Sequence, residues 1–272
     1  MKINPRYALI GVFALAFVLL GCVTTGPGGK TSFIIIPTDQ EVAIGQGMAE
    51  QISQTEKRLP DEEWQAYLNE VGQKIVKVSD RHDIEYHFTV IESDQINAFA
   101  APGGFVYFYT GLLSEMDNEA ELAAVMAHEI SHVVGRHGVK QVQAIMGVSL
   151  AYELATGGKE QSKALQTAIS VGLNLIFAGY SREHEREADD FGFTYMMKAG
   201  YDPHAMVTMF EKLAAHGGES NSFEKLLASH PETQERIAYT QAKLNKMSPF
   251  PQGLTLAPEH YLQMRARLPK GN

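Results

Sequence analysis

Apolar residues along the first 113 positions repeat first at the spacing of a helix and then at the spacing of a strand. Residues 39–57 and 61–79 carry apolar side chains three and four positions apart, which predicts two amphipathic helices. In residues 86–90, Tyr, Phe and Val alternate with other residues, which predicts a half-buried strand. Residues 97–113 read NAFAAPGGFVYFYTGLL and predict two short strands joined by a Pro-Gly-Gly turn. We therefore expect a small sheet after the first two helices.

The helical spacing returns after the sheet. A helix is predicted over residues 118–137, ending near Gly138, because Asn118 and Glu121 resemble a capping box ahead of an apolar run. Residues 140–178 are rich in Ala and Gly and predict a helical hairpin, either packed on the domain or lying over a functional site. A membrane hairpin is the alternative, although its longest uncharged run, of about 18 mixed residues, barely reaches spanning length.

The remaining pattern is helical as well. Helices are predicted at residues 182–199, 203–216 and 231–246, followed from Ser248 by a Pro-rich and then weakly helical tail. The sequence contains no internal repeat. The prediction is an α+β fold that is mostly helical, with a small β-sheet beside the helix at residues 118–137.

The start of the chain predicts export. Residues 1–22, MKINPRYALIGVFALAFVLLGC, have a basic start and an apolar run, and they end in a sequence that resembles a bacterial lipobox. We expect residues 1–21 to be a lipoprotein signal peptide and Cys22 to be lipidated; an uncleaved anchor is the alternative. Val23 in place of Asp resembles the sorting pattern of Gram-negative lipoproteins of the outer membrane, facing the periplasm. Cys22 is the one cysteine, so no internal disulfide forms.

The net charge of the chain limits the kinds of binding partner that we expect. The formal net charge is −9, and removing residues 1–21, which hold two of the 23 basic residues and none of the 32 acidic ones, makes it −11. An acidic surface argues against nucleic acid and against electrostatic docking on anionic lipid. We divide the chain into a tether at residues 22–38, a catalytic domain at residues 39–247 and a C-terminal extension at residues 248–272.

The predicted helix at residues 118–137 contains a metal-binding pattern, AVMAHEISHVVGRHG. His128 and His132 are four residues apart, so both rings lie on one face of the helix, one turn apart, and can share one tetrahedral zinc ion. Glu129 follows the first histidine and can take a proton from a water molecule at the metal. A helix with surface histidines is the alternative interpretation.

Two residues compete to be the third ligand. His137 lies nine positions after His128, which is about opposite it on a continuing helix, so we expect a structural or helix-capping histidine. Glu185 lies downstream in SREHEREADDFG, and Asp189 follows it by four positions. Glutamate can bind zinc beside two histidines, and an aspartate one turn on can accept the N–H of a ligand imidazole. By the same geometry, His184 and Glu187 are predicted to face solvent.

The motifs HEISH (128–132) and EREAD (185–189) together resemble the gluzincin zinc metallopeptidases of the CAAX-prenyl-protease type. Within them, the chain is most similar to the lipoprotein or periplasmic branch that polices outer-membrane assembly (BepA-like) and to the mitochondrial Oma-type peptidases. The similarity extends over about residues 40–246 and includes SHPETQERI near the end. It implies a zincin-type fold.

The resemblance also implies roles for residues. It implies one zinc ion held by His128, His132 and Glu185, with Glu129 as general base and Asp189 behind a ligand histidine. His230 and Arg236 match a histidine and an arginine that the family brings to its active site. That histidine can steady the oxyanion, or it can bind the zinc and hold the enzyme inactive.

Two function classes follow from these patterns. The first is a zinc endopeptidase, attached to the membrane by its N-terminal lipid, that degrades unfolded or misassembled envelope proteins bound along an edge strand within residues 97–110. The second is a zinc-binding periplasmic chaperone or assembly factor with latent proteolysis. The resemblance implies outer-membrane assembly machinery as a partner, although no helical-repeat region follows the catalytic domain here. An integral prenyl-protein protease is disfavoured because the sequence lacks several long apolar spans.

Overall fold

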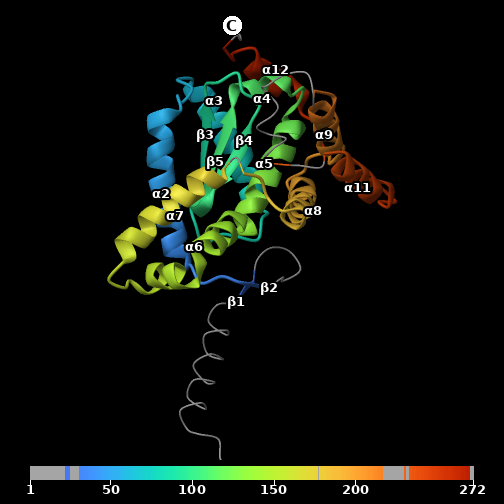
Figure 1. The fold of residues 1–272 in the computed structure, drawn as a ribbon. Helices are drawn as coiled ribbons and strands as arrows, with labels where there is room; N and C mark the ends of the chain where they lie inside the picture. Colours follow the sequence, from blue (N-terminus) through green and yellow to red (C-terminus); the bar gives the residue numbers. More distant parts are fainter. Residues whose placement is uncertain (1–21, 25–30, 177, 217–229, 231–232, 270–272) are drawn as a thin grey trace, which may run out of the picture.

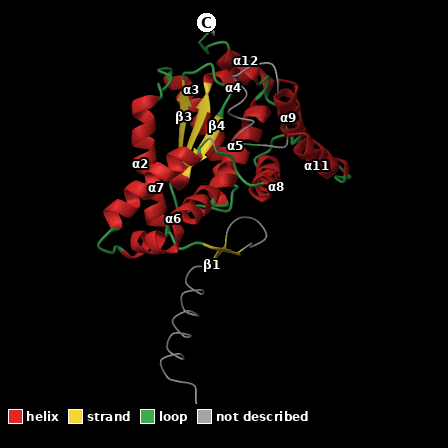
Figure 2. Cartoon of the chain, in the orientation of Figure 1, coloured by secondary structure: helices red, strands yellow, loops and turns green. Residues whose placement is uncertain are grey.

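The computed structural model describes residues 22–24, 31–176, 178–216, 230 and 233–269, so the predicted signal peptide lies outside the described part (Figure 1). Its strands and 3-10 turn are β1 (Cys22–Thr24), β2 (Thr31–Phe33), β3 (His87–Ile91), β4 (Ala98–Ala101), η1 (Pro102–Gly104) and β5 (Phe105–Tyr109). Its helices are α2 (Thr38–Thr55), α3 (Glu62–Val76), α4 (Thr110–Glu115), α5 (Glu119–Val134), α6 (His137–Thr156), α7 (Gln161–Leu175), α8 (Arg182–Lys198), α9 (His204–His216), α11 (Thr233–Asn245) and α12 (Pro258–Arg265). The fold is the predicted mostly helical α+β architecture (Figure 2).

The central sheet has the order β3-β5-β4, with β3 parallel and β4 antiparallel to β5. The predicted Pro-Gly-Gly turn joins β4 to β5, and its Gly103 has a φ of 76°. A side chain at Gly103 would be strained, and its Cβ would lie 2.9 Å from the Cα of Val42. The glycine therefore allows both the turn and the close packing of α2 on it.

Alternate residues of the sheet belong to two different cores. On β5, Val106 and Phe108 face the larger core, while Tyr107 and Tyr109 face the smaller one. The larger core contains side chains of α3, α5, α8, α9 and α12, and the smaller core contains those of α2, α6 and α7. In Figure 1 the sheet lies between these two groups of helices.

The predicted helix at residues 118–137 is shorter than expected. It ends at Val134, because Gly135 forms the C-cap and Arg136 takes a left-handed conformation with a φ of 53°. The chain then restarts as α6 at His137. The carboxylate of Glu41 accepts hydrogen bonds from Arg136 (2.7 Å) and from both terminal nitrogens of Arg81, Nη1 at 2.9 Å and Nη2 at 2.8 Å. This buried ion-pair network stabilises the break between α5 and α6, which the periodicity of the sequence does not indicate.

Residues on both sides of the predicted catalytic domain pack against it. Ile34 and Ile36 of the predicted tether are buried in the smaller core. In the predicted C-terminal extension, Tyr261 is fully buried and donates a hydrogen bond to the carbonyl of Leu113, and Trp64 donates one of 2.9 Å to the carbonyl of Met264. These segments therefore belong to the folded body of the molecule.

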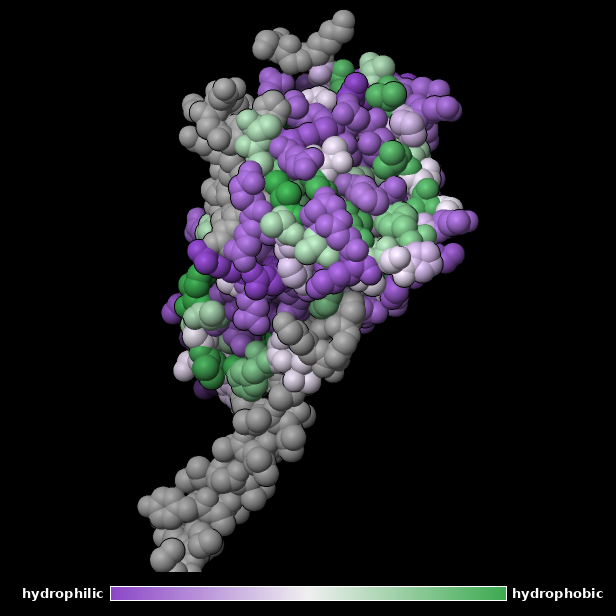
Figure 3. Space-filling model, turned by 90° about the vertical axis from the view of Figure 1, so that its right-hand side faces the viewer, coloured by the Kyte–Doolittle hydropathy of each residue, from purple (hydrophilic) through white to green (hydrophobic). Residues whose placement is uncertain are grey.

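The predicted hairpin is present as α6 and α7, which pack on each other and on α2. Helix α6 is broken at Gly147, where φ is 75° and ψ is 165°. Among the helices in the described ranges, none has the length and apolarity needed to cross a membrane. The face seen in Figure 3 is mostly hydrophilic, with hydrophobic residues in small groups.

Candidate active site

Helix α5 begins with a side-chain cap that sets its register. The side-chain oxygen of Asn118 accepts the N–H of Glu121 at 3.0 Å. Glu121 in turn accepts the N–H of Asp117 at 2.8 Å, one residue before the position that a capping box uses. The apolar side chains of the helix are buried on both of its sides, and so are His128, Glu129 and His132.

Helix α8 brings the acidic motif against α5. Ser181 caps this helix by accepting the N–H of His184 at 3.2 Å. At the crossing point, a Cβ on Gly192 would lie 3.2 Å from the backbone nitrogen of His128. The glycine thus permits the close approach that carries Glu185 and Asp189 to the two histidines.

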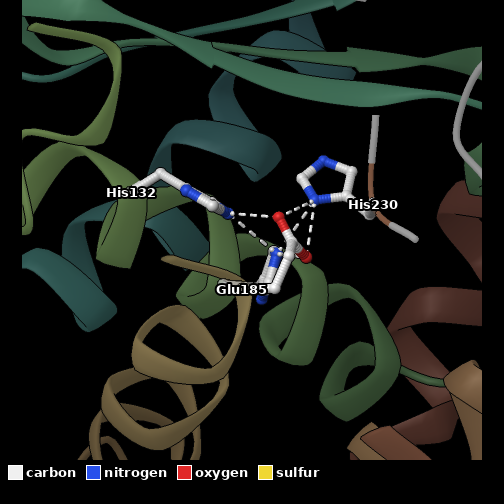
Figure 4. Close-up of side chains that lie close together, drawn as sticks. His132, Glu185 and His230 are labelled. Carbon is white, nitrogen blue, oxygen red and sulfur yellow. Dashed lines mark hydrogen bonds and ion pairs between the residues drawn. The ribbon is translucent and has the colours of Figure 1, made fainter. Parts of the chain in front are cut away.

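Four buried side chains converge at the centre of the crossing. They come from α5, from α8 and from the segment before α11, and they are His128, His132, Glu185 and His230. One metal-binding atom from each lies within 4.8 Å of every other. In Figure 4 the carboxylate of Glu185 lies between the rings of His132 and His230.

The spacing of the four groups fits one zinc ion. The Nε2 atom of His128 lies 3.0 Å from Nε2 of His132, 3.2 Å from Nδ1 of His230 and 3.5 Å from Oε2 of Glu185. A tetrahedral zinc ion with bonds of about 2.0–2.2 Å places its ligand atoms about 3.3–3.6 Å apart. The donor types are those of a tetrahedral zinc site, and the spacings of 3.0–3.5 Å are at or slightly below those of such a site, with His230 in the fourth position.

Around Glu185 and His132, the surroundings favour the protonation states that a metal needs. Burial opposes the charge on Glu185, but His230 and Arg236 hold the pKa of this carboxyl well below its usual range. Burial lowers the pKa of His132 well below its ordinary value, so the ring stays neutral with a free lone pair. A charged carboxylate and a neutral imidazole are both ready to bind a cation.

Asp189 supports His128 from behind. Its Oδ1 atom lies 3.0 Å from Nδ1 of His128. Arg236 donates two hydrogen bonds of 2.7 and 2.8 Å to the carboxylate of Asp189. The other terminal nitrogen of Arg236 lies 3.2 Å from Oε2 of Glu185. Because its charge is taken up by these two carboxylates, we propose that Arg236 positions the ligands rather than acting as a catalytic residue.

His137 supports His132 in a corresponding way. Its Nδ1 atom lies 2.9 Å from Nδ1 of His132, since the break at Arg136 turns it back toward the site. Burial lowers the pKa of His137 to about 4, so the neutral ring can accept the N–H of His132. The expectation of a continuing helix was wrong. Of the two predicted roles for His137, the structure agrees with the structural one and not with the helix cap.

The prediction that His184 and Glu187 face solvent was also wrong. The His184 ring stacks on His137 with centroids 4.2 Å apart. Glu187 is buried, with Oε1 3.8 Å from Nε2 of His137. The break before α6 creates this contact, because it folds the start of α6 over the first turns of α8.

Glu129 lies beside the ligand group without belonging to it. It is 1% exposed, and its Oε1 atom is 3.5 Å from Nε2 of His230. Its Oε2 atom has no hydrogen-bond partner among the described residues. Burial raises the pKa of Glu129. A buried carboxylate with a free oxygen next to a metal site is suited to exchange a proton with a water molecule.

An apolar pocket of about 470 Å³ opens beside Glu129. Val125 of α5 and Met206, Met209, Phe210 and Leu213 of α9 form its apolar wall. His128 and His230 also line it, so the pocket adjoins the metal-binding group. Such a pocket can receive an apolar side chain of a ligand held at the site.

The site has the ligand set of a zinc hydrolase, and the comparison with known proteins identifies its class. Peptidase family M48 matches residues 62–243, a range that includes all four convergent residues. The chain belongs to peptidase family M48. It is therefore a zinc metalloprotease with a single zinc ion, as the HEISH and EREAD motifs predict.

Individual relatives show how far the similarity extends. The chain is 30% identical over 248 residues to the beta-barrel assembly-enhancing protease of Yersinia pestis, covering 88% of this chain and 50% of the relative. It is 31% identical over 230 residues to the protein of that name in Escherichia coli K12, covering 82% and 47%. Metalloprotease YcaL of Escherichia coli K12 is 26% identical over 250 residues, covering 87% and 96%. The chain thus spans about half the length of the first two relatives.

Several features of this M48 site were missed from the sequence. The partner role of His137 was missed because it depends on the helix break, for which Gly135-Arg136 is the only local signal. Tyr180, whose ring stacks on His132 at 4.0 Å, lies in a loop with no periodicity. The apolar pocket combines α5 and α9, and 70 positions separate the end of α5 from the start of α9.

Proposed function

We propose that this M48 protease is an endopeptidase, attached to the envelope membrane through Cys22, that degrades misfolded or misassembled envelope proteins. The main observation that supports peptidase activity is the position of Glu129. It lies beside four convergent metal-binding groups, is buried and keeps one carboxylate oxygen free among the described residues. That arrangement suits hydrolysis better than storage or structural binding of a metal.

The residues divide the chemistry among them. His128, His132 and Glu185 would hold the zinc ion. When bound, the ion would polarise the scissile carbonyl and lower the pKa of a bound water molecule toward neutrality. Glu129 takes the proton from the attacking water and delivers it to the leaving amine. Asp189 and His137 orient the two ligand imidazoles, and Arg236 holds Asp189 and Glu185 in place.

The surroundings of the site favour an extended, unfolded substrate. Strand β4 is at the edge of the sheet and packs against α5, so a substrate strand could add along it beside the metal. The apolar pocket at Val125 and Leu213 could take one substrate side chain. Backbone pairing and a single apolar pocket are available to misfolded chains, whose main chain and apolar residues are exposed.

The location and partners are proposed from the N-terminus and the relatives. The lipobox-like ending at Cys22 and Val23 supports an outer-membrane lipoprotein that faces the periplasm. The names of the relatives, which refer to beta-barrel assembly, support envelope protein substrates and contact with the outer-membrane assembly machinery. The acidic net charge of −9 supports the absence of a nucleic-acid partner.

The test is zinc content and casein cleavage measured on the same preparations. Glu129→Gln should retain zinc and lose cleavage by about 10²–10⁴-fold, because it removes a general base without removing a ligand. Glu211→Gln, a change to an exposed glutamate on α9, is the matched control and should retain both. Unchanged cleavage by Glu129→Gln would overturn the peptidase mechanism.

A second candidate function is a zinc-binding chaperone or assembly factor with latent proteolysis. It is favoured by His230, whose Nδ1 atom lies 3.2 Å from Nε2 of His128 and 3.0 Å from Oε1 of Glu185. In that place the ring occupies the fourth position, which a catalytic zinc site keeps open for water and substrate.

The effect of His230→Ala on casein cleavage separates the two roles of this histidine. If His230 holds the enzyme inactive, cleavage rises while zinc content is unchanged, and this is the result we expect. A fall of about 10²–10³-fold would instead assign His230 to stabilisation of the oxyanion. A chaperone role gains support if Glu129→Gln leaves the cellular phenotype of the wild type intact.

A further inference from the structure

The most exposed large apolar side chains of the described residues lie together at one end of the molecule. Val148, Ile145 and Phe33 are 64%, 60% and 46% exposed. We call these three residues the α6 patch. Ile145 and Val148 lie on either side of the break in α6 at Gly147, where a Cβ would meet nothing within 4 Å. Hydrophobic residues also reach the surface at the lower end of Figure 3, the end at which Figure 1 shows β1, β2 and α6.

Hydrogen bonds hold Phe33 against α6. The carbonyl of Phe33 accepts a bond of 3.2 Å from the side-chain amide of Gln143, and the N–H of Ile35 donates one of 2.6 Å to the same side chain. Ile34 and Ile36 are buried on either side of Ile35, in the core that also contains Val142. The α6 patch is therefore a fixed feature of the folded body.

The N-terminal segment joins the folded body next to this patch. Cys22 of β1 pairs with Phe33 of β2, and paired strands lie about 5 Å apart. The residues before Cys22 contain the apolar run ALIGVFALAFVLLG, which would place residue 22 at a membrane surface whether the run is cleaved with lipidation or retained. The interfacial layer of a bilayer is about 5–8 Å deep on each side. A residue adjacent to Cys22 would then lie at or within that layer.

We propose that the α6 patch is a second membrane contact, which inserts Phe33, Ile145 and Val148 into the lipid interface. The inference rests on the proposed membrane attachment at Cys22. The occupant is lipid held by apolar contact, because a chain with a net charge of −9 gains nothing from anionic headgroups. Since α6 begins at His137, which contacts His132 of α5, the membrane contact would fix the orientation of α5 relative to the membrane.

The test measures how close position 148 comes to lipid. Full-length protein carrying Val148→Trp is reconstituted in phosphatidylcholine vesicles that contain a lipid spin-labelled near the headgroup. Leu256→Trp is the matched control, because Leu256 is 44% exposed and lies in the C-terminal segment outside the α6 patch. The wild type gives the background of Trp64, the one native tryptophan, which is fully buried.

We expect the tryptophan of Val148→Trp to be quenched at least about threefold more than that of Leu256→Trp, as for a side chain inserted about 5–10 Å into the interface. Ile145→Trp should behave like Val148→Trp and guards against a local disturbance in either variant. The quenching should persist at high salt and should not require phosphatidylglycerol.

Three results would overturn the proposal. Equal quenching at positions 148 and 256 would mean that the patch faces water. Quenching that appears only with phosphatidylglycerol would mean docking by charge. A tryptophan at position 148 that is shielded from both iodide and the spin label would mean that protein covers the patch, either the N-terminal segment or a second copy. The mass of the N-terminal peptide shows separately whether Cys22 carries lipid, and casein cleavage shows separately whether the peptidase works.

Discussion

At the scale of single residues, each of the two histidines proposed as zinc ligands has a partner on the far side of its ring. His128 has Asp189 at 3.0 Å, and His132 has His137 at 2.9 Å. Both partners contact the Nδ1 atom, which leaves Nε2 of each ring directed at the other ligands. The same geometry distinguishes a ligand from a supporting residue. The ring of His132 lies between His137 and the other metal-binding side chains, so His137 cannot bind the same metal ion.

This distinction predicts different zinc contents for two alanine variants. Glu185→Ala removes a negative ligand and should lose most of the bound zinc after dialysis. His137→Ala removes only the hydrogen-bond acceptor behind His132, which lowers the zinc affinity by about 10–100-fold. This variant should therefore keep most of its zinc in a buffer with micromolar free zinc. Metal analysis after dialysis decides the matter. Zinc retained by Glu185→Ala and lost by His137→Ala would reverse the two assignments.

At the scale of elements, the site depends on the close crossing of α5 and α8. Gly192 is the contact point, and a Cβ there would lie 3.2 Å from the nitrogen of His128 and 3.3 Å from the carbonyl carbon of Ala127. Both of these are backbone atoms of α5, so neither can turn aside as a side chain would. Any added volume must move one helix relative to the other, and the ligands with it.

Gly192→Ala should therefore lower both stability and zinc affinity, although alanine favours a helix by about 1 kcal/mol over glycine. Overpacking costs about 1–3 kcal/mol, and we expect a net loss in the free energy of unfolding measured in urea. Gly172→Ala on α7 is the control, because its Cβ would meet only the flexible side chain of Met48. A Gly172→Ala protein that loses as much zinc as Gly192→Ala would show that the helix crossing is not the cause.

At the scale of the whole molecule, polar contacts join segments that are far apart in sequence. The buried carboxylate of Glu119, at the start of α5, accepts hydrogen bonds from Tyr67 at 2.8 Å and from Tyr201 at 2.6 Å. Lys74 lies 3.4 Å from the same group. The carboxylate of Glu119 thereby joins helix α3, helix α5 and the chain after α8.

The charge of Glu119 should make part of the stability depend on pH. Burial opposes the charge, but the hydrogen bonds from Tyr201 and Tyr67 leave the pKa of Glu119 below its ordinary value of 4.5. Because the folded pKa is the lower one, the carboxylate stabilises the fold above pH 4.5 and loses this contribution as pH falls through the folded pKa. Glu119→Gln should lower the free energy of unfolding by about 1–3 kcal/mol at pH 7.

Urea unfolding at several pH values tests this dependence. The difference between wild type and Glu119→Gln should shrink as the pH falls below 4.5. Glu70→Gln, at an exposed partner of Lys74, is the control and should change the unfolding little at any pH. A difference for Glu119→Gln that stays constant down to acid pH would assign the effect to packing rather than to charge.

The sequence by itself determined the class of fold and the two motifs whose side chains the structure brings together. Helical and strand periodicity depend on neighbouring residues, so the two early helices, the Pro-Gly-Gly turn between β4 and β5 and the hairpin of α6 and α7 were predicted correctly. His128 and His132 share a helix face by spacing alone, and the paired motifs indicated the M48 family that the comparison confirmed.

Only the tertiary structure decided how distant segments meet. The end of α5 at Val134 depends on Arg136 in a left-handed conformation, held by Glu41 from a helix about 95 residues earlier. That contact in turn places His137 behind His132 and buries Glu187. The pocket of α5 and α9 and the pairing of Cys22 with Phe33 are likewise set by packing. Local periodicity carries no information about such contacts, because their energy comes from groups that the chain brings together only on folding.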